Sequence, residues 1–352
     1  MSLSSRTVNL ALLTILVLEF LSGTGSLLVG TSDGRWVFWT HRAGAFALLV
    51  LLGWKARIIL RSYRKRGLTL STTLSGGLLA LLLATVAAGL LWASIGLPGA
   101  TVPGLGALTG LGLHILLALL LAPPLLIHAR GRWRQVRLRR ADFASRRAAL
   151  RYLTFGAVGV VGWRAGEALT LAAGWSGARR RFTGSREIGS LGGNTFPTTS
   201  WLTDAVPVLD PATWRLRIFG AVEREFALTL SDLGRITPSS RRVVLDCTSG
   251  WYTVQDWHGI SVAELLAEAG IGGNARSLVV HSATGYRRRY ALAEAGRLLL
   301  ATQVGAEPLT AGHGYPLRLV APGWRGDAWV KWVVAVEVSA APAWWQAPLP
   351  LQ

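Results

Sequence analysis

The chain has 352 residues, of which 51% are hydrophobic and 16% are charged, and its mean hydropathy is +0.39. This combination is typical of a protein with a membrane-embedded part and unusual for a soluble globular one. The formal net charge is +19, and residues 1–181 carry 22 Lys and Arg against four Asp and Glu. Because the basic half is also the apolar half, we expect no nucleic-acid binding, which needs cations on a water-facing surface.

Sulfur-containing residues are nearly absent. Cys247 is the one cysteine and Met1 is the one methionine. A single cysteine excludes an internal disulfide, a cysteine-based structural zinc site, a four-cysteine iron–sulfur cluster and a c-type haem, which needs C-x-x-C-H. A haem in this chain would have no methionine ligand, so two histidines would be the natural pair to hold it.

Five apolar stretches are long enough to span a bilayer, which takes about 20 residues each. They are Leu10–Val29, Val37–Trp54, Leu70–Leu91, Ala107–Ile127 and Leu150–Leu171. Lysine and arginine crowd the loops after the second and fourth stretches, whereas 30–36 and 96–106 hold one cation, Arg35. By the positive-inside rule the basic loops are cytoplasmic, so everything after about residue 175 is extracytoplasmic. We therefore expect a multi-pass protein of the cell membrane, with its first span uncleaved.

These patterns divide the chain into successive parts. We expect a four-helix transmembrane domain over 1–130, then a basic loop with a fifth transmembrane helix over 131–173. A Gly/Ser-rich linker over 174–193 leads into a second domain at 194–340, and 341–352 form a tail. Ser145-Arg146-Arg147, before the fifth span, resembles the twin-arginine export signal of proteins that fold around a cofactor before export. The alternative is that Arg146 and Arg147 only add to the positive-inside charge.

The second domain shows short alternating or β-branched runs typical of strands. The predicted strands are 214–219, 226–230, 241–245, 277–282, 317–320 and 330–338. Helical patterns interrupt them at Ser261–Ala269, after an N-cap serine, and at Leu292–Leu298. The sequence therefore predicts a multidomain membrane protein, with an all-α transmembrane bundle followed by an α+β domain.

Histidines within the predicted spans indicate a haem, since ionisable residues in a span are costly and functional by default. His41 in the second span and His114 in the fourth lie at similar depth in the outer leaflet, on different helices. A b-type haem needs two neutral imidazoles in this arrangement. His128 lies 14 residues beyond His114, about 21 Å along the axis, where the other spans offer no histidine partner. We therefore predict one haem, bound by His41 and His114 in a cytochrome b-like domain.

Two arginines in the outer parts of spans, Arg42 and Arg164, are candidates to pair with haem propionates. Arg164 could instead form an ion pair with Glu167, three residues away on the same helix. The whole histidine set could alternatively serve a proton relay or a buried polar role.

Cys247 ends an apolar run on the expected extracytoplasmic side, where a free thiol is a liability unless a soft metal holds it as thiolate. The spacing Cys247-x3-Trp251-x5-Trp257-x-Gly259 resembles the segment around the molybdenum-ligating cysteine of the sulfite oxidase family of molybdopterin enzymes. It is most similar to the branch that contains the periplasmic methionine sulfoxide reductase catalytic subunit. Further blocks resemble the same family, in the same order: Asn194-Thr195-Phe196, DPATWRLRIFGAV (210–222), AGHGYPLRLVAPG (311–323) and Val330-Lys331-Trp332.

The resemblance implies a role for each matching position. Cys247 would supply the thiolate to molybdenum and would be the catalytic residue. Residues implied to line or hold the pterin and its phosphate are Asn194, Pro197, Thr198, Ser282, His313, Arg318, Trp329, Val330 and Lys331. Elementary chemistry agrees for Arg318 and Lys331, because a buried phosphate is best held by a guanidinium fork and an ammonium.

One departure from the family bears on substrate. Sulfite oxidases and plant nitrate reductases have arginines close after the cysteine, whereas Cys247–Tyr252 reads CTSGWY, with no cation. A neutral, Trp/Tyr-lined pocket suits a small neutral or zwitterionic oxygen acceptor, such as a sulfoxide, better than sulfite. Arg287, Arg288 and Arg289 could still bring charge from another loop.

The two halves together predict a membrane-bound molybdopterin-dependent oxidoreductase. It would transfer an oxygen atom to or from a small molecule at an extracytoplasmic molybdenum centre. Electrons would pass through one membrane haem b to or from quinone or another redox partner. Two alternatives remain open: the same molybdenum domain on a haem-free anchor with a separate redox partner, or a non-enzymatic sensor or binding domain on a membrane anchor.

Overall fold

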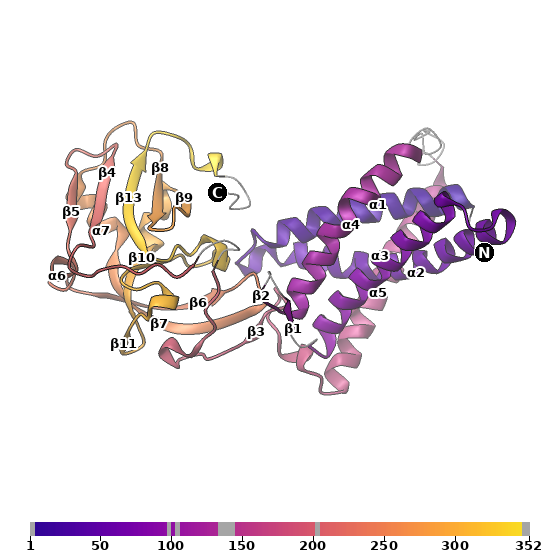
Figure 1. Ribbon diagram of the computed structural model, residues 1–352, viewed down its shortest axis with the longest axis horizontal. Helices are drawn as coiled ribbons and strands as arrows, with labels where there is room; N and C mark the ends of the chain where they lie inside the picture. Colours follow the sequence, from indigo (N-terminus) through magenta and orange to yellow (C-terminus); the bar gives the residue numbers. More distant parts are fainter. Residues whose placement is uncertain (1–3, 97–99, 103–105, 133–144, 201–204, 347–352) are drawn as a thin grey trace. The chain divides into compact units, whose positions relative to one another are not determined.

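The computed structural model describes residues 4–96, 100–102, 106–132, 145–200 and 205–346 (Figure 1). The chain forms two compact units, one of residues 1–27 and 32–186 and the other of residues 28–31 and 187–352. Part of the predicted basic loop, with Arg134, Arg137, Arg139 and Arg140, and the last six residues of the predicted tail lie outside the described residues.

The first unit contains a long helix at each of the five predicted spans. They are α1 (Ser5–Ser26), α2 (Arg35–Arg66), α3 (Leu70–Ser94), α4 (Gly110–Arg132) and α5 (Arg146–Ala172). Among the described residues, four helices are long and apolar enough to cross a membrane, namely α1 to α4. The fifth, α5, carries Arg151, Arg164 and Glu167, and its role as a span stays a prediction.

The predicted loop after the second span is largely helical. Sequence reasoning placed Lys55 to Arg66 in a loop, but α2 continues to Arg66 and ends at Gly67, whose φ of 66° is accessible to glycine at little cost. Arginine and lysine are good helix formers, so a basic run extends a helix without breaking it. At about 1.5 Å per residue, a 32-residue helix is about 48 Å long, well beyond the apolar thickness of a bilayer.

The helices of the first unit pack through leucines, alanines and glycines. Leu48 and Leu51 of α2 and Leu121 of α4 are buried in one cluster with Val8 of α1. A Cβ at Gly159 of α5 would lie 2.4 Å from the Ala43 carbonyl oxygen of α2. Small residues at such positions allow two helices to approach closely, which is a common packing mode within membranes.

The second unit contains two sheets (Figure 1). The six-stranded sheet comprises β3 (Arg186–Glu187), β6 (Ser239–Asp246), β7 (Trp251–Ser261), β10 (Leu299–Val304), β11 (Glu307–Pro308) and β12 (Arg318–Val320). The five-stranded sheet comprises β4 (Leu216–Gly220), β5 (Phe226–Leu228), β8 (Ser277–Ser282), β9 (Arg287–Ala291) and β13 (Val333–Ser339). Strands β6, β7, β10, β11 and β12 pair in antiparallel fashion, as do β4, β5, β8, β9 and β13, except that β13 runs parallel to β4. Two helices accompany the sheets, α6 (Leu230–Leu233) and α7 (Val262–Ala269).

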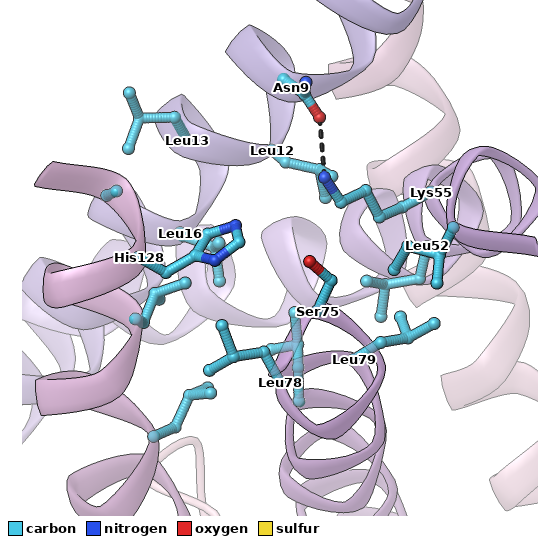
Figure 2. A pocket seen from close by; sticks show the side chains of 15 residues that line it. Asn9, Leu12, Leu13, Leu16, Leu52, Lys55, Ser75, Leu78, Leu79 and His128 are labelled. Atoms are coloured by element: carbon cyan, nitrogen blue, oxygen red, sulfur yellow. Dashed lines mark hydrogen bonds between the residues drawn. The ribbon is translucent and has the colours of Figure 1, made fainter. Parts of the chain in front are cut away.

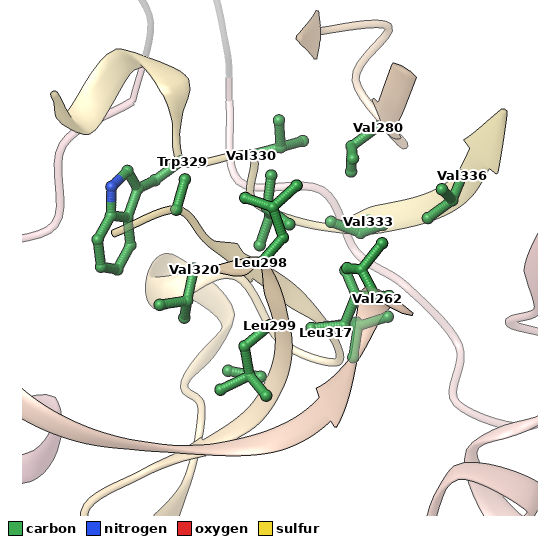
Figure 3. Packing of buried hydrophobic residues seen from close by; sticks show 14 of the residues in the cluster. Val262, Val280, Leu298, Leu299, Leu317, Val320, Trp329, Val330, Val333 and Val336 are labelled. Carbon is green, nitrogen blue, oxygen red and sulfur yellow. The ribbon is translucent and has the colours of Figure 1, made fainter. Parts of the chain in front are cut away.

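One hydrophobic core joins the two sheets (Figure 3). Val280 of β8 and Val336 of β13 come from the five-stranded sheet, and Leu299 of β10 and Val320 of β12 come from the six-stranded one. All four side chains are completely buried, and α7 adds Val262 to the same cluster. Full burial of a Val or Leu side chain contributes about 1.5–3 kcal/mol, so this core provides a firm support for the loops that it carries.

The sequence located most of these elements. Strand β8 coincides with the predicted run 277–282, and α7 begins directly after Ser261, as expected. Residues Leu292–Arg297 form a 3-10 helix, where the sequence suggested a helical stretch of unspecified type. The longest strand, β7, had no prediction because its buried face includes Thr253 and Gln255, so hydrophobicity does not alternate along it.

Candidate active site

Cys247 lies in the tight connection between β6 and β7, which pair as antiparallel neighbours up to Asp246 and Tyr252. The Cys247 amide donates to the Trp251 carbonyl at 2.8 Å, and Gly250 donates to the Cys247 carbonyl at 3.1 Å. Gly250 has a φ of 98°, which other residues rarely adopt. The turn fixes the cysteine backbone, and the Cys247 side chain is 7% exposed, with Sγ 3.1 Å from the Ser249 hydroxyl.

A second segment, residues 325–332, lies against this turn. Arg325 donates to the Asp246 carboxylate at 2.9 Å and to the Cys247 carbonyl at 3.3 Å, and both charged side chains are buried. A Cβ at Gly326 would lie 3.0 Å from the Cys247 Cα, so glycine allows the two backbones to approach. The ion pair and the close approach therefore set the position of the cysteine relative to the 325–332 segment.

These segments surround a pocket with a volume of about 80 Å³. Cys247 and Thr248 line it from the β6–β7 turn. Ser282 and Tyr286 line it from the β8–β9 hairpin. The remaining lining residues are Thr199, Ser200, Gly326, Asp327, Trp329, Lys331 and Trp332. The pocket thus combines a thiol, several hydroxyls, a carboxyl, an ammonium and three aromatic rings.

Lys331 and Arg318 bring positive charge to this pocket. The Lys331 ammonium donates to the Ser200 hydroxyl at 3.0 Å and the Gly312 carbonyl at 2.9 Å, and it lies 4.5 Å from the centre of the Trp332 ring. The buried Arg318 guanidinium lies over the rings of Trp257 and Trp329. Burial lowers the pKa of Arg318 to about 10, and Coulombic attraction to Cys247 acts in the opposite direction.

Arg318 also has an unused donor. It donates Nη1 to the His313 carbonyl, while its buried Nε has no hydrogen-bond partner among the described residues. A buried charged group normally satisfies its donors, because an unsatisfied one carries a desolvation cost of about 1–3 kcal/mol or more. A buried guanidinium with donor capacity to spare, beside a cysteine and a lysine, suits an anionic ligand.

His313 is held in one neutral form. Its Nε2 lies 2.8 Å from the Phe196 carbonyl, which can only accept, so Nε2 carries the proton. Its Nδ1 then accepts from the Thr310 hydroxyl at 2.7 Å. Burial lowers the pKa of His313, and the positive charges of Arg318 and Lys331 act in the same direction.

A carboxyl and a guanidinium pair at the pocket wall. Asp327 lines the pocket, and its carboxylate lies 3.4 Å from Arg288, whose side chain is only 4% exposed. Burial raises the pKa of Asp327, although Arg288 acts against this shift. Tyr286 donates its hydroxyl to the Asp327 carbonyl, which ties the β8–β9 hairpin to the 325–332 segment. The charge of Arg288 is therefore largely balanced at this wall.

Some of the site residues predicted from the sequence line this pocket, and others do not. Cys247, Ser282, Trp329 and Lys331 line the pocket, and Arg318 and His313 are buried nearby, joined by a hydrogen bond. Four other predicted residues are not among the lining residues: Asn194, Pro197, Thr198 and Val330.

Two of those four have a visible structural role. The Asn194 amide donates to the Pro308 carbonyl at 2.9 Å and accepts from the Thr310 amide at 3.2 Å, so it positions the chain ahead of His313. Val330 is completely buried in the core, and its carbonyl accepts from the Leu319 amide.

Sequence reasoning missed several residues of the pocket and its support. They are Thr199, Ser200, Thr248, Tyr286, Asp327 and Trp332 in the lining, and Asp246 and Arg325 behind it. Asp246 directly precedes Cys247 at the end of an apolar strand, and a charged residue at such a place is a signal for a buried partner. The partner, 79 positions away, gave no comparable signal in the sequence.

In the first unit, the structure brings together the two histidines predicted to bind haem. The rings of His41 and His114 have centres 6.0 Å apart. The His114 Nδ1 lies 2.8 Å from the Thr85 carbonyl, which can only accept, so Nδ1 carries the proton. The His41 Nδ1 lies 3.1 Å from the Glu19 carboxylate and 3.1 Å from the Ser22 hydroxyl. Both Nδ1 atoms therefore have partners on the helices around them.

The arginines considered for haem propionates form ion pairs in the described structure. Arg42 and Arg164 both contact the Glu167 carboxylate, at 3.1 Å and 2.9 Å. Arg42 also donates to the Phe182 carbonyl at 2.8 Å. The i, i+3 pair that the sequence offered as the alternative for Arg164 is present.

Comparisons with known proteins agree with this geometry. Residues 203–345 match the family model described as oxidoreductase molybdopterin binding domain. The second unit therefore contains a molybdopterin-binding oxidoreductase domain, which is similar to sulfite oxidase and nitrate reductase. This assignment makes the domain an enzyme and disfavours the non-enzymatic sensor considered from the sequence.

Individual relatives cover different shares of the chain. An uncharacterized oxidoreductase of Bacillus subtilis (strain 168), YuiH, is 28% identical over 42% of this chain and 79% of its own length. Mitochondrial sulfite oxidase of Rattus norvegicus is 29% identical over 40% of this chain, and nitrate reductase [NAD(P)H] of Hordeum vulgare is 27% identical over 38%. The chain spans only 32% and 19% of the length of these last two.

The sulfane dehydrogenase SoxCD from Paracoccus pantotrophus is 28% identical over 39% of this chain and 40% of its own, with a TM-score of 0.37.

The domain assignment implies a molybdenum cofactor, and the residues present fit one. The Cys247 thiol can ligate a soft metal, and the spare donor of Arg318 and the Lys331 ammonium are suited to the phosphate of the pterin. Three aromatic rings line the pocket and can contact the flat pterin ring system.

Proposed function

We propose that this protein is a membrane-bound molybdopterin-dependent oxidoreductase that transfers an oxygen atom at an extracytoplasmic molybdenum centre. The observation that carries the proposal is the position of the Cys247 thiol, on the wall of a pocket that also contains Lys331. When bound, the cofactor would supply the two-electron oxygen-atom transfer. Cys247 would ligate molybdenum, and Lys331, Arg318 and His313 would hold the pterin and its phosphate.

We propose a small neutral or zwitterionic oxygen acceptor, such as a sulfoxide, as substrate, in line with the resemblance to the methionine sulfoxide reductase branch. The sequence Cys247–Tyr252 contains no cation. The arginine that the β8–β9 hairpin brings to the pocket, Arg288, is paired with Asp327. Tyr286, Trp329 and Trp332 supply aromatic surface for an uncharged group. An oxyanion such as sulfite would need an unpaired cation in this place.

We also propose that His41 and His114 bind one haem b. A histidine that ligates a metal commonly donates its other ring N–H to a carboxylate or a carbonyl, and the contacts with Glu19 and Thr85 are of this kind. The two imidazoles would hold the iron between them, and metal–nitrogen bonds of about 2 Å require the two rings to lie close together. The observed 6.0 Å suits this arrangement. A Cβ at Gly89 would lie 2.9 Å from the His114 Nδ1. Glycine at this position therefore makes room for the His114 imidazole.

The helices α1 to α4 support a location in the membrane, and the distribution of Lys and Arg supports an extracytoplasmic second unit. Quinone in the bilayer would exchange electrons with the haem. The remaining alternative keeps the molybdenum domain and replaces the haem with a separate redox partner. A visible absorption spectrum of the purified protein separates the two, because only the first proposal requires a Soret band.

The test of the molybdenum site is the variant Cys247→Ser in the full chain. Serine preserves the size of the side chain but is a poor ligand for a soft metal. We expect loss of oxygen-atom transfer, measured with a reduced viologen dye as electron donor and a sulfoxide as acceptor. Molybdenum and pterin per chain are measured on the same sample. Unchanged activity and molybdenum content in the variant would show that the assignment is wrong.

The export route has its own test. Replacing Arg146 and Arg147 with lysine keeps the charge that the positive-inside rule counts, but it removes the twin-arginine pattern. We expect the second unit to remain on the cytoplasmic side, as measured by its resistance to protease added from outside. Normal export of the folded domain would instead mean that these two residues act only as topological charge.

A further inference from the structure

The first unit contains a cavity of about 130 Å³ among α1, α2, α3 and α4 (Figure 2). Most of its wall is leucine, including Leu16 of α1, Leu52 of α2, Leu78 of α3 and Leu125 of α4. The cavity is therefore a predominantly apolar chamber inside the group of helices that are suited to cross a membrane.

Four polar side chains, one from each helix, converge on this cavity. Figure 2 shows Asn9 of α1, Lys55 of α2, Ser75 of α3 and His128 of α4 directed toward the same space. The Lys55 ammonium donates to the Asn9 side-chain carbonyl at 2.9 Å. Asn9, Lys55 and His128 directly flank the predicted spans 10–29, 37–54 and 107–127 at their cytoplasmic ends, and Ser75 lies within the third span. The polar end of the cavity therefore lies at the predicted cytoplasmic boundary of the membrane, where the polar head of a lipid-soluble molecule is favourably placed.

The size and the donors of the cavity define what it can bind. An engineered apolar cavity of about 150 Å³ is large enough to bind benzene, so a volume of about 130 Å³ is of the right size for one six-membered ring. An ammonium and an imidazole next to that ring can donate to oxygen atoms on it. Leucine walls suit an apolar remainder of the same molecule. The features together describe a flat ring with acceptor oxygens and a hydrocarbon chain.

We propose that this cavity binds the head group of an isoprenoid quinone, with Lys55 and His128 donating hydrogen bonds to its carbonyl oxygens. This inference rests on the proposed function, in which quinone exchanges electrons with a haem at His41 and His114. It adds the place of binding and the residues that bind.

The leucine-lined part of the cavity extends toward the histidine pair. Leu121 lines the cavity and is seven residues from His114 on α4, which corresponds to about two helical turns. On α1, Leu16 lines the cavity one turn before Glu19, which contacts His41. Lys55 and His128 each lie 14 residues from His41 and His114 on the same helices, about 21 Å along the axis. A ring that they hold would therefore lie at the end of the cavity distant from the haem, with the leucine-lined part of the cavity between them.

The electrons and protons of the two half-reactions balance without a further reactant. Oxidation of one quinol to quinone releases two electrons and two protons, and the electrons leave one at a time through the haem. Reduction of one sulfoxide to a sulfide consumes two electrons and two protons and gives one water. In the opposite direction, the same balance runs in reverse. His128, a side chain that gains and loses a proton near neutral pH, is suited to take the quinol proton at its ring nitrogen.

A phospholipid is the competing occupant, because it also combines a polar head with acyl chains. Its phosphate would call for several cationic donors, and Lys55 is the one Lys or Arg among the residues lining the cavity. A neutral quinone ring needs only hydrogen bonds, which these side chains can provide. The observations therefore favour the quinone.

The test is photoaffinity labelling of the full chain in nanodiscs with an azido-ubiquinone, followed by peptide mapping. We expect labelled peptides around Lys55 and His128, and competition by an excess of decyl-ubiquinone. The variant Leu125→Trp fills the cavity and should raise the half-saturating probe concentration by about tenfold. The matched control Leu126→Trp changes the next residue, which is 69% exposed, and should leave labelling as in the wild type.

A second pair of variants tests the polar end. Lys55→Met removes the ammonium and should raise the half-saturating concentration by about tenfold. Lys65→Met removes an exposed ammonium further along the same helix and should have no such effect. Because Leu125→Trp and Lys55→Met could disturb folding, their haem content and α-helical circular dichroism are measured alongside.

The outcomes separate this inference from the proposed function. Labelling at the cavity in protein without haem would support the quinone site and count against the haem. A normal haem spectrum with labelling elsewhere, or with labelling that Leu125→Trp does not weaken, would overturn the quinone site alone. Displacement of the probe by phospholipid but not by decyl-ubiquinone would assign the cavity to a lipid and would also overturn the proposal.

Discussion

Arg325 and Asp246 form a buried ion pair next to the Cys247 turn, with an Nη1–Oδ1 distance of 2.9 Å and both side chains 3% exposed. The same guanidinium donates to the Cys247 carbonyl. The pair therefore joins the end of β6 to the segment that carries Asp327, Trp329 and Lys331. Its position makes it a structural support for the cysteine, since neither charge is among the residues that line the pocket.

We predict that Arg325→Met destabilises the protein by about 3–5 kcal/mol, because it removes the buried ion pair and leaves the Asp246 carboxylate buried without the Arg325 charge. Thermal unfolding of the full chain, followed by tryptophan fluorescence, measures the effect. The control is Arg224→Met, which breaks an exposed pair with Glu268 at a similar distance of 3.0 Å. Exposed pairs contribute about 0–1 kcal/mol, so a loss of the same size in both variants would contradict the role assigned to Arg325.

The pKa of His313 leads to a prediction about pH. Burial lowers the pKa of the folded His313 imidazole below its ordinary value of 6.5. Between the folded pKa and pH 6.5, the unfolded chain therefore binds a proton at this residue more readily than the folded chain does. Stability from this group is thus present above pH 6.5 and decreases as the pH falls from 6.5 toward the folded pKa. His313→Gln keeps a donor for Phe196 and an acceptor for Thr310 but does not titrate.

The free energy of unfolding is therefore measured between pH 5 and pH 8 in protein without cofactor. The free energy of unfolding of the wild type should fall below pH 6.5, with a slope of up to about 1.4 kcal/mol per pH unit from His313. The variant should not show this contribution to the pH dependence. Parallel curves for the two proteins would mean that His313 is protonated equally well in the folded and unfolded states.

Sequence reasoning found the five long helices, α7, six strands of the second unit and the cysteine, because each depends on local patterns. Hydropathy locates α1 to α5, and β-branched runs locate β8 and β13. The partners of these elements depend on tertiary structure, so Arg325 beside Asp246 and Arg288 beside Asp327 could not be predicted. Glu19 could have been recognised as a candidate, since a carboxyl in an apolar span is itself a functional signal. Its contact with His41 required the structure.

Lys331 gives a prediction about cofactor retention. Its ammonium is held at the pocket by Ser200 and Gly312. Lys331→Met removes the cation, and we expect about tenfold weaker retention of the pterin, since a hydrogen bond to a charged group contributes about 1.5–3 kcal/mol. Lys331→Arg, which keeps a cation at this position, should recover part of the pterin retention. Pterin per chain after extended dialysis measures retention, and equal values for all three proteins would remove Lys331 from the cofactor site.

The proposed haem is tested by exchanging histidines one at a time. His41→Leu and His114→Leu should each abolish the low-spin spectrum, because one remaining imidazole cannot provide both axial ligands. His128→Leu should retain it, since that residue lies 14 positions beyond His114 and lines the other cavity. Glu19→Gln should retain the haem but raise its midpoint potential, because a neutral acceptor makes the His41 imidazole a weaker electron donor to iron. A spectrum that survives loss of His41 or His114 would assign the iron to other ligands, and a potential unaffected by Glu19→Gln would separate that carboxyl from the ligand.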